Sequence, residues 1–405
     1  MRHSTNRILV SHAGNLPRPD YLDELIAGGR AREGSNRQEY HERLPKAVKY
    51  IVDRQAELGV DVVNDGEYAK AGSYGGYMQE RVEGFSSVPV DPNRKPKRAG
   101  TAERDRLQFP GFYASGLWYS GSGGPIRPGF ATPGEVRTIQ SRETRACTAP
   151  VRYIGQSAVA EDTANLKAAI EGMDVEGCIT ALGPLSLGAG IHNLYYNSEE
   201  EYMQAVADAC HEEYKAIADS GLVLQLDEPE FCTTWSFYPD WTVDDLRRYL
   251  SGAVETINYA LRGIPEEQVR FHTCWGSGHR PHVTDIELHH FADLLVKINA
   301  QCISVEAANV RHEHEWTVWE DVKLPDGRIL MPGVISHATD LVEHPDLIAE
   351  RLVNYASVVG KENVQTGTDC GIGSRVGHEE IVWAKLATMS EGARRASAQL
   401  WGGLS

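Results

Sequence analysis

Eight short apolar segments, rich in β-branched residues, recur along the chain and alternate with longer segments of helical periodicity. The predicted strands are residues 7–10, 61–64, 177–181, 222–226, 269–272, 302–305, 329–335 and 363–366. The predicted helices include residues 37–58, 198–219, 242–262, 285–299, 345–360 and 378–400. Eight strands that alternate with helices are typical of a closed α/β barrel.

An open doubly wound sheet would usually carry a glycine-rich phosphate turn after its first strand. Here the residues after the first predicted strand read Ser11-His12-Ala13-Gly14-Asn15-Leu16-Pro17, which does not match that turn. We therefore predict a single (β/α)8 TIM barrel that spans residues 1–405.

Residues 86–150 interrupt the alternation, because they are rich in Gly, Pro, Ser and Arg and show little helical periodicity. They include a basic run, Arg94-Lys95-Pro96-Lys97-Arg98, and an aromatic stretch at 109–119. We predict a long inserted loop or hairpin after the second strand, over one end of the barrel. The alternative with a functional role is a lid whose aromatic and arginine side chains close the substrate pocket.

The chain has 405 residues, with 40 Lys and Arg against 57 Asp and Glu, so its formal net charge is −17. An acidic surface repels phosphate backbones and anionic lipid, and no run of ~18 apolar residues is present. We therefore expect no nucleic-acid partner and no membrane association. Seven scattered cysteines without a CxxC pair indicate a reducing compartment. With a short polar N-terminus, this favours the cytoplasm; the oligomeric state stays open.

Polar side chains follow all eight predicted strands, at the end of a barrel where active sites form. His272 and Cys274 are two residues apart, so in an extended chain they point to the same face. With Glu306 after the next strand and Cys370 after the last, they offer one nitrogen, two sulfurs and one carboxylate, a set that suits tetrahedral Zn²⁺. The alternative is that His272 and Cys274 are ordinary strand residues and Cys370 is a buried thiol.

Zinc would explain why a catalyst uses such a set. A free thiol has a pKa of about 8.5 and is mostly protonated at neutral pH. Coordination removes the proton and leaves a sulfur that still attacks carbon. A displaceable fourth ligand leaves room for an incoming substrate sulfur, which is typical of catalytic rather than structural zinc. A hydrolase that activates water would favour His and carboxylate ligands over two thiolates.

Taken together, these motifs resemble the catalytic barrel of cobalamin-independent methionine synthase. The motifs are His272-x-Cys274, Val305-Glu306-Ala307, Pro332-Gly333-Val334, Thr368-Asp369-Cys370-Gly371, Gln225-Leu226-Asp227-Glu228-Pro229, Gly14-Asn15-Leu16-Pro17, Asp65-Gly66-Glu67 and Leu182-Gly183-Pro184. The length fits a short, single-barrel branch of that family, which also includes the epoxyalkane:coenzyme M transferases.

The resemblance implies a zinc ion held by His272, Cys274, Glu306 and Cys370, with a substrate thiol bound as thiolate. It also implies that acidic residues hold the amino group of homocysteine, and these fall on Glu67 and Asp227 here. An ammonium group does favour anionic acceptors. The alternative for both carboxylates is a solvated salt bridge on the rim of the barrel.

Three further residues follow from the same resemblance. His337 lies near the family's histidine that helps to protonate the folate leaving nitrogen, although it is equally typical of a plain loop histidine. Asn15 stands where the methionine synthases carry a Ser that helps to hold the amino acid. Leu194-Tyr195-Tyr196 stands where they carry a Trp that stacks on the pterin, so Tyr195 is the predicted stacking residue.

These features together predict a zinc-dependent, cobalamin-independent S-alkyltransferase. The expected reaction is methyl transfer from methyltetrahydrofolate, or another methyl donor, to a homocysteine-like thiol. Asp227 and His337 are its predicted catalytic residues. One alternative is a thiol transferase that opens an epoxide or another small electrophile, with arginines of the insertion binding an anionic thiol. A barrel retained as a non-catalytic binding protein is a further alternative.

Overall fold

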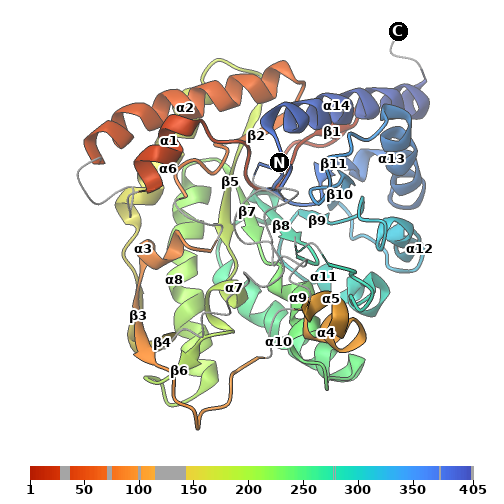
Figure 1. The fold of residues 1–405 in the computed structure, drawn as a ribbon. Coiled ribbons are helices and arrows are strands. Elements are labelled where there is room, and N and C mark those ends of the chain that lie inside the picture. The colour runs from red at the N-terminus through yellow and green to blue at the C-terminus, as the bar shows by residue number, and fades with distance from the viewer. Residues whose placement is uncertain are drawn as a thin grey trace.

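Eight parallel strands form one sheet in the order β1-β11-β10-β9-β8-β7-β5-β2, with helices packed around it (Figure 1). The computed structural model describes residues 1–27, 37–70, 75–98, 102–114, 143–276, 278, 280–373 and 375–402. The strands are β1 (Leu9–Val10), β2 (Val62–Asn64), β5 (Glu176–Leu182), β7 (Val223–Asp227), β8 (Val269–Thr273), β9 (Cys302–Val305), β10 (Ile329–Ile335) and β11 (Gln365–Thr368).

The first and last strands in this order, β1 and β2, also lie next to each other. The backbone N–H of Asp61, just before β2, donates to the carbonyl of Val10 in β1 at 2.8 Å. All residues of the eight strands are buried except Glu176, which is half-buried, as expected when helices cover the outside and side chains fill the inside. The predicted (β/α)8 TIM barrel is confirmed, and all eight predicted strands are present.

Five of the six predicted helices are present and begin and end close to the predicted positions. The helices that surround the barrel are α1 (Asp20–Ala27), α2 (Arg37–Glu57), α6 (Gln156–Ile170), α7 (Pro184–Gly188), α8 (Glu199–Asp219), α9 (Glu230–Phe237), α10 (Val243–Ala260), α11 (Ala292–Leu295), α12 (Val318–Asp321), α13 (Pro345–Val359) and α14 (Glu379–Trp401). Ser198 and Thr242 cap α8 and α10, and each accepts a hydrogen bond from a backbone N–H of the first turn.

The helix predicted over 285–299 is wrong, since only a short 3₁₀ turn (Leu288–His290) and α11 form there. The backbone N–H groups of Thr284 and Leu288 donate to the carboxylates of Asp105 and Glu315, at 3.1 and 2.6 Å. The carboxylate of Glu315 therefore takes the Leu288 N–H that a helix beginning at residue 285 would use for its own hydrogen bond to residue 284.

The insertion after β2 contributes strands to a second, smaller sheet. Its strands are β3 (Val82–Pro89), β4 (Glu143–Tyr153) and β6 (His192–Asn193), and β3 pairs with β4 in antiparallel register. This sheet lies beside the barrel, at the lower left of Figure 1. The hairpin prediction is confirmed, and the insertion also contains α4 (Glu103–Gln108) and α5 (Pro110–Ala114), while α3 (Met78–Arg81) precedes it. The centre of the predicted lid, residues 115–142, lies outside the described residues.

A buried carboxylate attaches the insertion to the barrel. Asp105 in α4 is fully buried and accepts hydrogen bonds from Arg280 Nη1 at 2.8 Å and from the backbone and hydroxyl of Thr284. The other terminal nitrogen of Arg280 donates to the carbonyl of Trp275 and pairs with Asp285, each at 2.8 Å. The insertion therefore contacts the loop that follows β8 through one ion-pair network.

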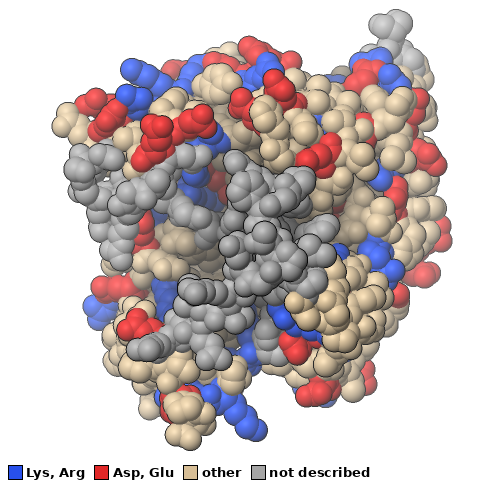
Figure 2. Space-filling model, in the orientation of Figure 1, with Lys and Arg blue, Asp and Glu red and all other residues tan. Residues whose placement is uncertain are grey.

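The outer face of α2 is charged, and its acidic and basic side chains are interspersed at the top of the view in Figure 2. Neighbouring charges pair along the helix, for example Arg43 with Glu39 and Arg54 with Glu57. Among the helices that the structure describes, none has the length and apolar character needed to cross a membrane.

Candidate metal centre

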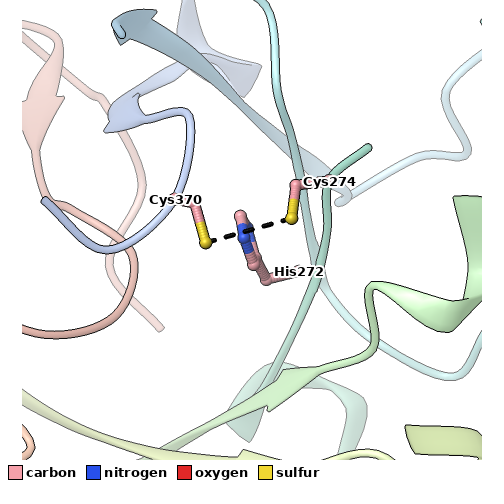
Figure 3. A group of neighbouring side chains, drawn as sticks. All are labelled: His272, Cys274 and Cys370. Atoms are coloured by element: carbon pink, nitrogen blue, oxygen red, sulfur yellow. Dashed lines mark hydrogen bonds between the residues drawn. The ribbon is translucent and has the colours of Figure 1, made fainter. Parts of the chain in front are cut away.

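The parallel strands bring three of the predicted zinc ligands together at their carboxyl ends. His272 lies in β8, Cys274 follows that strand, and Cys370 follows β11 (Figure 3). Their ligand atoms all lie within 4.8 Å of one another, and the two sulfurs are 3.9 Å apart. Two sulfurs bound to one tetrahedral Zn²⁺ at about 2.3 Å would lie ~3.8 Å apart. The observed spacing therefore fits a shared ion.

Glycine residues allow the turn that carries Cys370 to approach the turn after β1. Gly14 has a φ of +69°, and a Cβ added there would lie 2.8 Å from the Cα of Gly371. A Cβ added to Gly371 would lie 2.4 Å from the side-chain oxygen of Asn15. Because only glycine tolerates this contact, the sequence places Asn15 directly beside the Cys370 turn.

The imidazole of His272 is oriented as a metal ligand would be. Its Nδ1 lies 2.9 Å from the hydroxyl of Ser304 in β9, while its Nε2 is buried without a hydrogen-bond partner among the described residues. Metal-bound histidines usually have the second ring nitrogen held in this way, which fixes the tautomer and ring orientation. In Figure 3 the ring projects between the two sulfurs.

The thiol of Cys274 donates a hydrogen bond to the sulfur of Cys370. The hydrogen bond from Cys274 lowers the pKa of Cys370 well below its usual range, and His272 adds to this effect, although burial opposes it. The same hydrogen bond, followed by burial, raises the pKa of Cys274. The pair therefore favours one thiolate before any ion is present, and a divalent ion would favour the second.

Glu306 does not belong to this three-residue set. Its carboxylate accepts hydrogen bonds from the backbone N–H of Trp275 at 2.8 Å and from Asn309 at 2.9 Å. It lies instead within 4.8 Å of His337 and Asp369, and all three are buried. The role of Glu306 as the fourth zinc ligand remains a prediction.

His337 is buried, and neither of its ring nitrogens has a hydrogen-bond partner among the described residues. Burial lowers its pKa. Burial therefore favours the neutral form of the ring, and the role of His337 as a general acid remains a prediction. Its position beside Glu306 puts it next to the candidate metal centre rather than on an outer loop.

The two predicted substrate carboxylates are buried near the ends of β2 and β7, the strands on either side of β5. Glu67 has a φ of +59°, uncommon for a residue other than glycine, and its Oε1 accepts from the hydroxyl of Thr180 in β5 at 2.7 Å. Asp227 ends β7 and accepts from Gln225 at 2.8 Å. Burial raises the pKa of Asp227 to about 7, with Glu67 adding to the rise and His272 opposing it.

Tyr195 is a predicted site residue that lies next to the small sheet rather than at the end of a barrel strand. It follows β6 in the small sheet, is half exposed and packs edge-on against Tyr196. Its stacking role remains a prediction.

Two residues near the site escaped the sequence analysis. Ser304 lies two positions before Glu306, on the same face of its strand, so the alternation of side chains could have indicated it. Lys70 lies three positions after Glu67, and its burial beside that carboxylate becomes visible only in the fold.

The comparisons with known proteins agree with this geometry. Residues 129–395 match the family model described as "Cobalamin-independent synthase, Catalytic domain". A methionine synthase of Saccharolobus solfataricus is 23% identical over 96% of this chain and 94% of its own length. A 2-hydroxypropyl-CoM lyase of Xanthobacter autotrophicus is 24% identical over 97% and 96%.

Two solved structures share the fold. A B12-independent methionine synthase from Shewanella sp. W3-18-1, in complex with selenomethionine, covers 97% of this chain and 99% of its own, with a TM-score of 0.68 and 18% identity. A putative vitamin-B12-independent methionine synthase from Listeria monocytogenes covers 98% and 100%, with a TM-score of 0.60 and 18% identity. The chain belongs to the family of cobalamin-independent synthase catalytic domains.

Proposed function

We propose that this protein is a zinc-dependent S-alkyltransferase that works without cobalamin and transfers a methyl group to a homocysteine-like thiol. Methyltetrahydrofolate or another methyl donor would supply the group. The observation that carries the proposal is the set of His272, Cys274 and Cys370, which a chain of this family brings within 4.8 Å at the carboxyl ends of its strands. We assign the protein to the cytoplasm, with small molecules as its partners.

His272, Cys274 and Cys370 would hold the zinc ion, with Glu306 next to them as the fourth ligand. When bound, zinc supplies the Lewis acidity that keeps a substrate sulfhydryl deprotonated at neutral pH. The hydrogen bond between the two thiols favours the thiolate of Cys370, so binding of the ion through both sulfurs would release the proton of Cys274. Ser304 holds the His272 ring in place.

The remaining groups would orient substrates and move the proton. Glu67 and Asp227 would face the acceptor, and Asn15 lies beside the Cys370 turn. The acceptor sulfur forms a bond to the methyl carbon as the bond to the donor nitrogen breaks, and His337 delivers a proton to that nitrogen. Tyr195 and the insertion at 86–150, as a lid, would cover the donor.

Replacement of Cys370 tests the proposal. A Cys370→Ala protein is expected to lose stoichiometric zinc, measured by elemental mass spectrometry, together with alkyl transfer. Cys147, a buried cysteine of β4 in the small sheet, provides the matched control, and Cys147→Ala is expected to retain both properties. If Cys370→Ala keeps full zinc and full activity, the proposed mechanism is wrong.

Epoxide opening is the second candidate, and the 2-hydroxypropyl-CoM lyase favours it because that relative aligns end to end at an identity similar to that of the methionine synthases. In that case a thiolate would attack an epoxide carbon, and the ring oxygen would take up the proton. A panel of thiols assayed with methyltetrahydrofolate and with epoxypropane separates the two candidates. Product formation with only one electrophile identifies the reaction.

A further inference from the structure

We propose that Arg270 is a positioning residue, which acts through Gln225 to hold the carboxylate of Asp227 so that one of its oxygens faces the amino group of the acceptor. The acceptor is then an α-amino thiol acid, and Arg270 contributes to its recognition without touching it. This inference rests on the proposed function, thiol alkylation at the candidate metal centre, and adds the residues that support one substrate-binding group.

Two neighbouring strands place the side chains concerned in two adjacent pairs. The register pairs Gln225 of β7 with Arg270 of β8, and two positions further along it pairs Asp227 with His272. Side chains two positions apart in a strand lie on the same face, so both pairs lie on one side of the sheet. The pair of Gln225 and Arg270 therefore lies next to a predicted substrate carboxylate and a predicted zinc ligand.

Arg270 is buried without an opposite charge. Only 1% of its surface is exposed, and its hydrogen-bond partners among the described residues are two neutral oxygens. Its Nη1 donates to the side-chain oxygen of Gln225 at 3.1 Å and to the carbonyl of His12 at 3.4 Å, while Nε and Nη2 have no partner in the described part of the chain. A buried cation without a carboxylate is costly. Packing alone therefore does not explain an arginine at this position.

The donors of Arg270 fix the direction of the Gln225 amide. A guanidinium group donates hydrogen bonds and accepts none, so Gln225 turns its oxygen toward Arg270. The amide nitrogen then points the other way, and it donates to Asp227 Oδ1 at 2.8 Å. With the amide reversed, an oxygen of Gln225 would face the carboxylate, and neither acceptor would have a donor. Arg270 thereby selects the one orientation in which Gln225 holds Asp227.

The other oxygen of Asp227 is left for a ligand. Gln225 holds Oδ1, while Oδ2 has no hydrogen-bond partner among the described residues. Glu67, on the other side of β5, is similar: its Oε1 accepts from the hydroxyl of Thr180 and lies 3.8 Å from Lys70, and its Oε2 has no partner within the described ranges. Two free carboxylate oxygens suit an ammonium group, which has three donors and favours anionic acceptors. A carboxylate held by one oxygen presents the second in a fixed direction, which lowers the cost of binding.

Homocysteine and γ-mercaptobutyrate, two thiols that differ only by the amino group, provide the test. Calorimetry on the zinc-loaded protein would give both dissociation constants, with proton release as evidence that sulfur binds as thiolate. The wild-type protein is expected to bind homocysteine at least about tenfold more tightly. Arg270→Met and Gln225→Leu are each expected to remove most of this preference, because they weaken homocysteine binding and change that of γ-mercaptobutyrate by less than about threefold.

A double variant shows whether the two residues act as one unit. If Arg270 acts through Gln225, the protein with both Arg270→Met and Gln225→Leu loses no more of the preference than either single variant. The double variant also addresses folding, because replacing both partners of a hydrogen bond by apolar groups is often nearly neutral. Gln365→Leu is the matched control: it changes a buried glutamine of β11 whose amide donates to the carbonyl of Arg2, and it should keep the wild-type preference.

The outcomes separate this inference from the proposed function. A wild-type ratio in either single variant overturns the inference, as do single effects that add in the double variant. If a single variant does not fold, the double variant decides, and a wild-type ratio there has the same consequence. Equal binding of the two thiols by the wild-type protein also overturns the inference, and in all these cases thiol alkylation at the metal centre stands. If neither thiol binds with proton release, both are overturned.

Discussion

Replacement of Asp105 by Ala would remove the buried carboxylate that joins the insertion to the loop after β8. Asp105 accepts three hydrogen bonds, two from Thr284 and one from the charged Arg280. Removing one partner of a buried ion pair typically costs 3–5 kcal/mol. Arg280 keeps Asp285 at 2.8 Å, so its charge stays paired and the expected cost is at the low end, about 3 kcal/mol.

Urea denaturation followed by circular dichroism measures this cost. A loss of ~3 kcal/mol would lower the midpoint by on the order of 1 M for a chain of this size. Asp219→Ala is the matched control, because Asp219 forms an exposed pair with Lys215 and such pairs contribute at most about 1 kcal/mol.

A second readout connects this perturbation to the metal. Arg280 holds the carbonyl of Trp275, the residue after Cys274, so the Asp105→Ala protein is also expected to release zinc to a chelator faster than wild type. An Asp105→Ala midpoint indistinguishable from that of the Asp219→Ala control would refute the reasoning, since the buried network would then contribute nothing.

Three other perturbations test the surroundings of the site. Ser304→Ala removes the partner of the His272 ring and should weaken zinc binding about 10–100-fold in a chelator competition; unchanged affinity would argue against an orienting role. Gly371→Ala places a methyl group 2.4 Å from a side-chain oxygen and should cost about 1–3 kcal/mol in thermal unfolding, whereas Gly252→Ala, with open space around it, should not destabilise. Burial lowers the pKa of His312, but hydrogen bonds to two carboxylates outweigh it and raise the pKa to about 9, so its stabilisation is full below pH 6.5 and is lost as the pH rises to about 9. That loss, about 3 kcal/mol, should be absent in His312→Gln, and equal pH profiles would contradict the assignment.

The fold could be predicted from the sequence because parallel barrel strands are buried on both sides and read as short apolar runs. The spacing of His272 and Cys274 placed two predicted metal ligands on one face, and closure of the barrel brought Cys370 within 4.8 Å of them. The helix expected at 285–299 did not form; within that segment the carboxylate of Glu315, more than 15 residues further along the chain, accepts from the backbone N–H of Leu288. Periodicity within a segment contains no information about such contacts.

The parts of the site that escaped prediction depend on partners across strands. Ser304 matters because its strand lies beside β8, and the register pairs it with His272. Lys70 matters because the turn after β2 directs it over Thr180 in the next strand. For Glu306, in contrast, the sequence predicted the position after β9. Its hydrogen bonds with the backbone N–H of Trp275 and with Asn309 could not be predicted, because they depend on how the loops fold.

The sulfurs of Cys274, which is buried, and Cys370, which is half-buried and favoured as a thiolate, are only 3.9 Å apart and are therefore prone to oxidation in air. They need approach by only about 2 Å to form a covalent cystine. Oxygen during purification would therefore join Cys274 to Cys370 wherever no ion holds them apart. Such a preparation would not bind zinc added later until a reductant had cleaved the disulfide. Handling the protein under nitrogen would preserve its capacity to bind zinc.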